Sequence, residues 1–80
     1  METQDLICQF INDELLFGDG SRLTAETQLL DEGILDSLGM LRMVEFLEHH
    51  FAIKVAAEEI NRKNFRSVNS LASFVEDKAA

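Results

Sequence analysis

Within the stretch ILDSLGMLRMVEFLE, residues 34–48, Ser37 is the residue whose side chain could take part in chemistry. A serine there could cap a helix, act as a nucleophile or carry an attached group. A nucleophilic serine needs a base within hydrogen-bond reach. The only histidines, His49 and His50, follow 12 and 13 residues later. On a continuous helix this is roughly 18 to 20 Å, so neither histidine can activate Ser37.

Other patterns that support catalysis or metal binding are missing from the sequence. The residues around Ser37 do not read G-x-S-x-G, and no strand signal precedes them to form a nucleophile elbow. The two histidines lack the H-E-x-x-H spacing of zinc sites. The acidic residues before the predicted second helix lack the calcium-loop pattern: Asp19, Asp31, Glu32 and Asp36. We therefore expect no enzyme activity and no metal site.

Composition limits the remaining possibilities. The 80 residues are 46% hydrophobic, which predicts a single domain, residues 1–80, with one core. The 15 acidic and 7 basic residues give a net charge of −8, which repels nucleic acids and anionic membranes and favours basic protein surfaces as partners. Because there is one cysteine, no secretion signal and no apolar run of about 20 residues, we expect a cytoplasmic protein.

The first half of the chain predicts two helices separated by a long loop. From Asp5 to Leu16 the apolar residues recur at spacings of three and four, which is typical of an amphipathic helix. Between Phe17 and Asp36 this periodicity fails, and three of the four glycines occur there. The loop carries apolar side chains that could pack beneath it: Leu23, Leu29, Leu30, Ile34 and Leu35. The second helix begins at Asp36 or Ser37, since either can satisfy free N–H groups.

The second half predicts a connector, a short helix and a final helix. The AIKV run at residues 52–55 has no partner strand, so it is interpreted as a connector. Residues 56–61 predict one or two helical turns. Ser67 is positioned to cap a final helix whose apolar face holds Val68, Leu71, Ala72 and Val75. We therefore predict an all-α, antiparallel four-helix bundle with three long helices and one short helix.

The predicted second helix has two different faces. At about 100° per residue, one side gathers the apolar residues Met40, Met43, Val44, Leu47 and Phe51. The opposite side gathers Leu38, Leu41, Arg42, Glu45, Glu48 and His49. Two leucines on a polar face have three explanations. Single exposed leucines are common in proteins, the long loop could cover Leu38 and Leu41, or the two could form a docking patch bordered by charged side chains.

The segment DEGILDSLGMLRMVEFLEHHFAIKV, residues 31–55, resembles the acyl and peptidyl (aminoacyl) carrier proteins. Their signature is Asp-Ser-Leu at the start of the second helix of a four-helix bundle. Further matching positions lie in the tail: Asn64, Phe65, Ser67, Val68 and Leu71. The resemblance covers nearly the whole chain, and the helix order, loop length and acidity make it specific.

The resemblance implies that Ser37 carries 4′-phosphopantetheine, transferred from coenzyme A by a phosphopantetheinyl transferase. Asp36 and Leu38 would be contacted by that transferase. The arm's thiol would hold an acyl or aminoacyl group as a thioester, supplied by a loading ligase and passed to downstream transferases. The protein would be a monomer without catalytic activity. The alternative is an unmodified acidic interaction domain that docks through Leu38 and Leu41.

Two departures from fatty-acid carriers indicate a specialised, stand-alone carrier. Arg42 lies on the exposed face of the second helix, where those carriers are strongly acidic, and Gly39 replaces a polar residue. The GILDSL spacing is more similar to discrete aminoacyl or D-alanyl carriers. Arg42 therefore either discriminates against enzymes of fatty-acid synthesis or only pairs with Glu45 or another nearby acid.

Overall fold

The computed structural model describes residues 2–16 and 23–79, and every regular element within them is helical. Helix α1 spans Glu2–Phe10 and continues directly into a π-helical turn, η1, at Ile11–Leu15. The amphipathic helix predicted from Asp5 is therefore confirmed, although it begins three residues earlier. The π turn closes with a hydrogen bond from the Leu16 amide to the Ile11 carbonyl, 2.9 Å long, and no sequence pattern predicted it.

The connection from η1 to the second helix has no regular structure over residues 23–36, as predicted. Residues 17–22, which include Gly18, Asp19 and Gly20 of the predicted loop, lie outside the described part of the chain. The loop packs through Leu29 and Leu35, which are buried. Its backbone also pairs with a segment far along the chain, because the Leu29 amide donates to the Arg66 carbonyl at 2.8 Å. The loop is thus packed by its own side chains.

Helix α2 spans Ser37–Phe51 and presents the predicted apolar stripe to the core. Met43 and Leu47 are completely buried, and the other stripe residues, Met40, Val44 and Phe51, are partly buried and packed on the core. The helix ends at Ala52, which adopts the left-handed conformation with φ of 56°.

The segment after α2 has no regular structure over residues 52–56, so its interpretation as a connector is confirmed. The short helix predicted for residues 56–61 is only partly correct. A 3₁₀ turn, η2, spans Ala57–Glu59, and the short α-helix lies further on as α3 at Arg62–Phe65. The reason is a cap, since the Asn61 side chain accepts a hydrogen bond from the Asn64 amide at 2.9 Å and starts the helix there.

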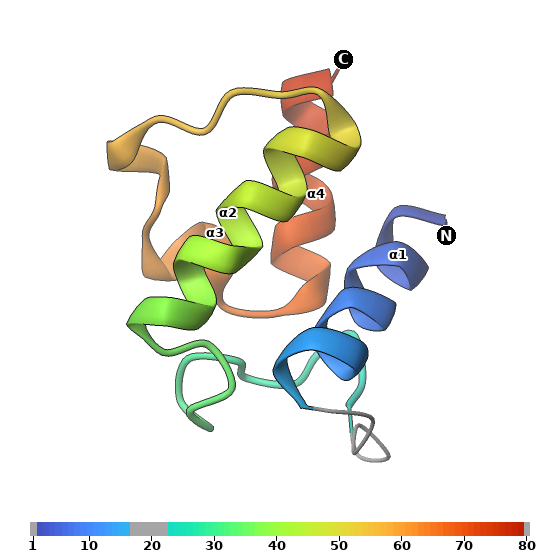
Figure 1. The fold of residues 1–80 in the computed structure, drawn as a ribbon, viewed down its shortest axis with the longest axis vertical. Coiled ribbons are helices and arrows are strands. Elements are labelled where there is room, and N and C mark those ends of the chain that lie inside the picture. The colour runs from blue at the N-terminus through green and yellow to red at the C-terminus, as the bar shows by residue number, and fades with distance from the viewer. Residues whose placement is uncertain (1, 17–22, 80) are drawn as a thin grey trace.

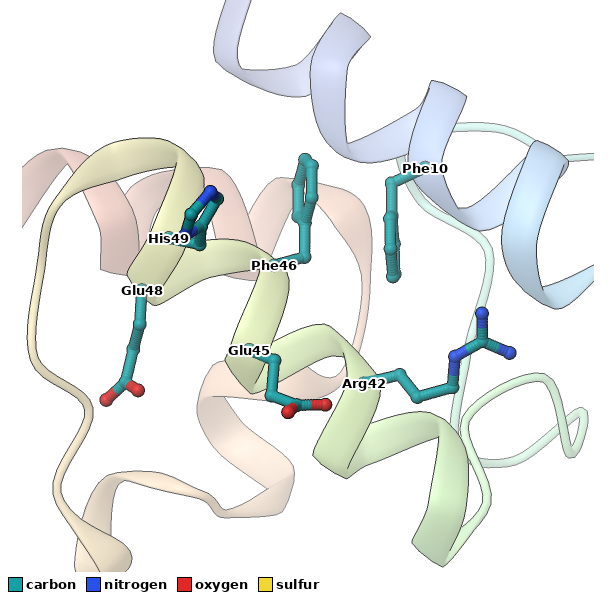
Figure 2. Close-up of a pocket in the computed structure, with 6 residues that line it drawn as sticks. All are labelled: Phe10, Arg42, Glu45, Phe46, Glu48 and His49. Atoms are coloured by element: carbon teal, nitrogen blue, oxygen red, sulfur yellow. The ribbon is translucent and has the colours of Figure 1, made fainter.

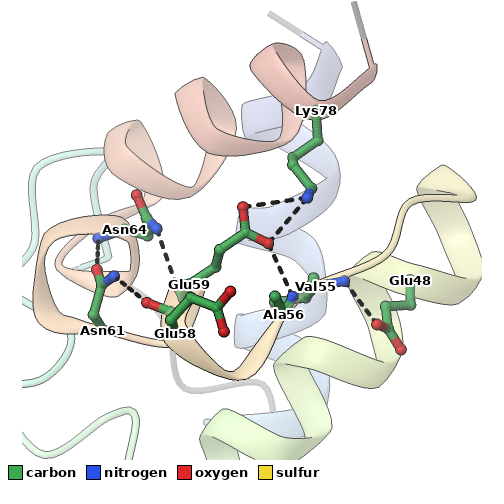
Figure 3. A network of polar contacts seen from close by, with 8 residues as sticks. All are labelled: Glu48, Val55, Ala56, Glu58, Glu59, Asn61, Asn64 and Lys78. Atoms are coloured by element: carbon green, nitrogen blue, oxygen red, sulfur yellow. Dashed lines mark hydrogen bonds and ion pairs between the residues drawn. The ribbon is translucent and has the colours of Figure 1, made fainter.

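Polar side chains fix the connector and η2 against the helices, as Figure 3 shows. Glu59 accepts hydrogen bonds from the Ala56 amide and from the Lys78 ammonium, each 2.9 Å long. Glu48 of α2 accepts a hydrogen bond of 2.8 Å from the Val55 amide. These contacts hold an irregular segment in place without a strand partner.

Helix α4 spans Val68–Ala79 and contacts α1, α2 and α3 (Figure 1). Ser67 caps it as predicted, since its hydroxyl accepts a hydrogen bond from the Ser70 amide at 3.2 Å. All four predicted core positions of this helix are buried: Val68, Leu71, Ala72 and Val75. With Phe65 and the loop leucines they form one core, and the all-α class is confirmed.

Candidate functional site

The start of α2 assigns different roles to Asp36 and Ser37. Asp36 has an extended backbone, and its Oδ1 accepts a hydrogen bond of 2.7 Å from the Gly39 amide. Asp36 is therefore the cap, which the sequence had left open between the two residues. Ser37 is the first residue of the helix and is exposed, and its hydroxyl has no hydrogen-bond partner among the described residues. Capping does not occupy this hydroxyl, so it is available for modification.

The geometry of the same turn explains why residue 39 is a glycine. It is buried, and a Cβ atom added there would lie 3.1 Å from the Asp36 Oδ1 and 3.5 Å from the Ile34 carbonyl oxygen. The capping carboxylate therefore approaches the helix closely because position 39 has no side chain. The departure from fatty-acid carriers at Gly39 thus contributes to the geometry around Ser37.

Leu38 and Leu41 project from α2 into solvent, with 66% and 61% of their surfaces exposed. They are large hydrophobic side chains one turn apart, directly beside Ser37. The loop could have covered them, but residues 23–36 pack elsewhere and leave them open. The idea that the loop covers the two leucines is therefore wrong for residues 23–36. Leu38 and Leu41 form an exposed apolar patch.

The charged residues of the exposed face have different surroundings. Arg42 pairs with Glu14 of η1 rather than with Glu45, with 2.8 Å between its Nη2 and Glu14 Oε1. Its Nη1 also donates to the Glu14 carbonyl at 3.3 Å. Glu45 is exposed and has no ion pair among the described residues, whereas Glu48 is held by the Val55 amide. Glu45 is therefore the carboxylate of this face that is most available to a partner.

An aromatic row lines the side of α2 that faces α1 (Figure 2). The Phe10 and Phe46 rings stack with centroids 4.3 Å apart, and His50 stacks on Phe46 at 5.2 Å. Beside the stack is a shallow groove of about 680 Å³, lined by Phe10, Arg42, Glu45, Phe46, Glu48 and His49. Sequence reasoning did not identify the partly buried Phe10 and Phe46 as residues of a groove, although Phe46 lies one turn beyond Arg42 on the same helix.

The remaining side chains that could be reactive are two histidines and one cysteine. His49 and His50 are exposed at the far end of α2 from Ser37. Burial, and then the nearby Asp5 carboxylate, raise the pKa of the Cys8 thiol above its ordinary value, as expected for a packed thiol. Across residues 2–16 and 23–79, no three His, Cys, Asp or Glu side chains are grouped to hold a metal ion.

None of the helices in the described ranges has the length and apolar character required to cross a bilayer.

Residues 5–75 match the protein family described as "Phosphopantetheine attachment site", and the chain therefore belongs to this family of carrier proteins. Its prosthetic group is 4′-phosphopantetheine. The N-terminal end of α2 fits an attached phosphodiester in two respects. The Ser37 hydroxyl is exposed, and a 15-residue helix directs its N-terminal N–H groups and the positive end of its dipole towards that place.

Similar proteins include the D-alanyl carrier proteins of streptococci. The Streptococcus mutans protein is 38% identical over 61 residues, which is 76% of this chain and 76% of that protein. The Streptococcus suis protein is 33% identical over 75 residues, or 94% of this chain and 92% of that protein.

One solved structure is similar in both fold and sequence. It is a chain in a structure described as "Crystal structure of FAD-dependent dehydrogenase", with a TM-score of 0.82 and 36% identity. The match covers 86% of this chain and 97% of that chain, so the matched chain is about as small as this one.

Proposed function

We propose that Ser37 carries the 4′-phosphopantetheine arm and that the protein is a stand-alone carrier of acyl or aminoacyl groups. The observation that carries this proposal is the division of roles at the start of α2. Asp36 caps the helix, which leaves the Ser37 hydroxyl exposed and without a hydrogen-bond partner among the described residues. The family match and the Asp-Ser-Leu signature support the same residue.

Attachment is the transfer of a phosphopantetheinyl group to Ser37. Its oxygen forms a bond to the phosphorus next to the pantetheine half of coenzyme A, while the pyrophosphate bond breaks and the adenosine bisphosphate half leaves. The hydroxyl proton must go to a base of the transferase, because both histidines of this chain lie at the other end of α2. The chain presents the residue and supplies no catalysis of its own.

The proposal extends to the whole chain. Residues 1–80 form one carrier domain, a four-helix bundle, that acts as a cytoplasmic monomer. Its cargo is an acyl or aminoacyl thioester of a specialised pathway rather than of fatty-acid synthesis, and the D-alanyl carriers among its relatives support an aminoacyl group. Because the similar solved chain comes from a crystal structure of an FAD-dependent dehydrogenase, that class of enzyme should also be tested as a partner.

Partners dock on the exposed face of α2. Leu38 and Leu41 offer apolar contact next to Ser37, and the exposed Glu45 offers a charge to a basic partner surface. The net charge of −8 favours the approach of such surfaces. Arg42 and Glu48 border the same face, although each already has a contact within the chain.

Intact-mass measurement after incubation with coenzyme A and a phosphopantetheinyl transferase tests the proposal. The wild-type protein should gain one phosphopantetheine group, and Ser37→Ala should gain none. Ser70→Ala is the matched control at another helix start, and it should be modified as the wild type is. If several active transferases leave the wild type unmodified, the alternative of an unmodified interaction domain is favoured.

A further inference from the structure

A groove between α3 and α4 gathers basic side chains on an otherwise acidic molecule. Its volume is about 550 Å³, and its lining residues all lie within positions 63–77. Among them Lys63 and Arg66 are cations and Asp77 is an acid. The groove is therefore basic, although the whole chain has 15 acidic and 7 basic residues.

The two cations of this groove are not used in charge balance within the described residues. Lys63 and Arg66 are exposed, and neither forms an ion pair there, not even with Asp77 of the same groove. Arg62, the residue before Lys63, does form one, with 2.6 Å between its Nη1 and the Asp31 Oδ1. The positive charge of Lys63 and Arg66 is therefore open to a partner.

The uncharged groups of the lining add hydrogen-bond donors. Asn69 accepts a hydrogen bond of 2.5 Å from Gln4 at its Oδ1, and its Nδ2 protons have no partner among the described residues. Ser70 accepts a hydrogen bond of 3.3 Å from the Ser67 hydroxyl, so its own proton is available. Ser73 is exposed and adds a further hydroxyl. Ionised carboxylates only accept hydrogen bonds, so they match this lining.

The size and the surroundings of the groove select a short ligand. Its volume lies within the roughly 300–1,000 Å³ found for small-molecule sites. A nucleic acid or an anionic bilayer extends beyond the groove and meets the acidic excess of the chain, which repels it over about 10 Å at 0.1 M ionic strength. A second copy of this chain brings another net charge of −8 and is repelled in the same way. A short acidic segment can place its carboxylates in the groove alone.

We infer that the groove between α3 and α4 binds a short segment of a partner protein that carries several aspartate or glutamate side chains. An exposed ion pair contributes little by itself, so the segment needs more than one carboxylate. This contact goes beyond attachment at Ser37. Because the lining lies within positions 63–77, the Leu38–Leu41 face stays free when the groove is occupied.

An NMR titration tests the inference on the full-length, unmodified protein, so the result does not depend on attachment of an arm. The probe is a synthetic eight-residue peptide of alternating glutamate and serine, added to ¹⁵N-labelled protein, and the control peptide has glutamine in place of glutamate. We expect the glutamate peptide to shift amide signals within residues 63–77 and the glutamine peptide to shift them far less. Equal shifts with both peptides, or no shift with the glutamate peptide in large excess, would overturn the inference.

Three single substitutions locate the contact. Lys63→Gln and Arg66→Gln should each weaken binding of the glutamate peptide by about 1.5-fold to fivefold, the range of one exposed ion pair. Lys54→Gln is the matched control, because Lys54 is also exposed, has no ion pair among the described residues and does not line the groove. It should bind the peptide as the wild type does. Equal weakening in all three variants would show a response to net charge alone and would contradict the inference.

Two other occupants of the groove would be recognised with the same variants. The protein is sedimented with vesicles of phosphatidylglycerol and phosphatidylcholine. Sedimentation that Arg66→Gln abolishes, without a response to the peptide, would assign the groove to a bilayer and overturn the inference. Amide shifts within residues 63–77 that grow with protein concentration, again without a response to the peptide, would assign it to a second copy of the chain.

Discussion

Arg42 of α2 and Glu14 of η1 form an ion pair with a separation of 2.8 Å, although they are 28 positions apart in the chain. Arg42 lines both the aromatic groove between α1 and α2 and a smaller hollow formed by η1, the loop and the start of α2. The pair therefore links the π turn to the helix that presents Ser37. It also gives Arg42 a partner within the chain, at a position expected to face other proteins.

A double-mutant cycle with Arg42→Gln and Glu14→Gln should measure the coupling of this pair. Both side chains are about half exposed, at 40% and 51%. Exposed pairs contribute about 0.2–1 kcal/mol. We expect a coupling in this range from chemical denaturation in urea. It should shrink in added salt, because the screening length falls from about 10 Å at 0.1 M to about 3 Å at 1 M. A coupling that salt leaves unchanged would exclude a mainly electrostatic contact.

Replacing Asp36 should separate capping from recognition. Asp36→Ala removes the acceptor for the Gly39 amide and should cost about 1 kcal/mol. For a domain of this size, that lowers the melting temperature by about 4–8 °C. Asp36→Asn keeps a side-chain acceptor and should retain most of the stability.

If the transferase contacts the Asp36 carboxylate, it should nevertheless modify Asp36→Ala and Asp36→Asn at similarly reduced rates. Thermal unfolding and the rate of mass gain from coenzyme A provide the two readouts. Asn and Ala variants with equal stability would mean that the cap contributes little. An Asn variant modified at the wild-type rate would remove the carboxylate from recognition.

The helices could be predicted because their apolar residues repeat every three or four positions, as in α4 from Val68 to Val75. The start of α2 could also be predicted, since Asp36 and Ser37 are both capping residue types. The cap itself could not be assigned, because that depends on which side chain reaches the Gly39 amide. Local patterns thus predicted α1, α2, α4 and the position of Ser37 at the start of α2, but not the π turn η1 or the place of α3.

Contacts between distant segments could not be read from the sequence. Nothing in the spacing indicates that Glu14 rather than Glu45 faces Arg42, since their proximity depends on how α1 packs near α2. The stacking of Phe10 on Phe46 arises from the same packing. The smaller hollow at Arg42 is formed by η1, the loop and α2 together, and so it also required the tertiary structure.

Glu59 should make stability depend on acidic pH. The hydrogen bond from the Ala56 amide, and then the contact with Lys78, lower the pKa of Glu59 from its ordinary value of 4.5. A lowered pKa in the folded state stabilises the protein above the ordinary value, and this contribution is lost as the pH falls through the folded pKa.

Glu59→Gln should therefore melt at a lower temperature than the wild type at neutral pH. The difference should disappear in acid, below the lowered pKa. Glu58→Gln is the matched control, because Glu58 is exposed and its side chain has no ion pair among the described residues. A Glu59→Gln difference that stays constant from neutral to acidic pH would contradict the assignment.

The exposed leucines should affect modification without affecting folding. Leu38→Ser and Leu41→Ser should change the free energy of unfolding by less than about 0.5 kcal/mol, as is usual for surface positions. Leu47→Ala, a buried control on the same helix, should cost about 2–5 kcal/mol. A leucine buried by a partner contributes about 1.5–3 kcal/mol. We therefore expect the transferase to act at least about tenfold more slowly on each serine variant. Wild-type rates would exclude these leucines from docking.

Arg42→Glu tests whether this position selects among partner enzymes. An enzyme adapted to an all-acidic second helix carries a basic residue that Arg42 repels, and like charges at an interface raise the cost of the wrong complex. We expect Arg42→Glu to improve loading by an acyl transferase of fatty-acid synthesis and to impair loading by the cognate ligase, with unchanged helix content. The substitution also places a second carboxylate against Glu14, so the same change should be measured in a Glu14→Gln background, where that repulsion is absent. Loading rates within about twofold of the parent for both enzymes, or less than about 0.4 kcal/mol in the barrier, would restrict Arg42 to its contact with Glu14.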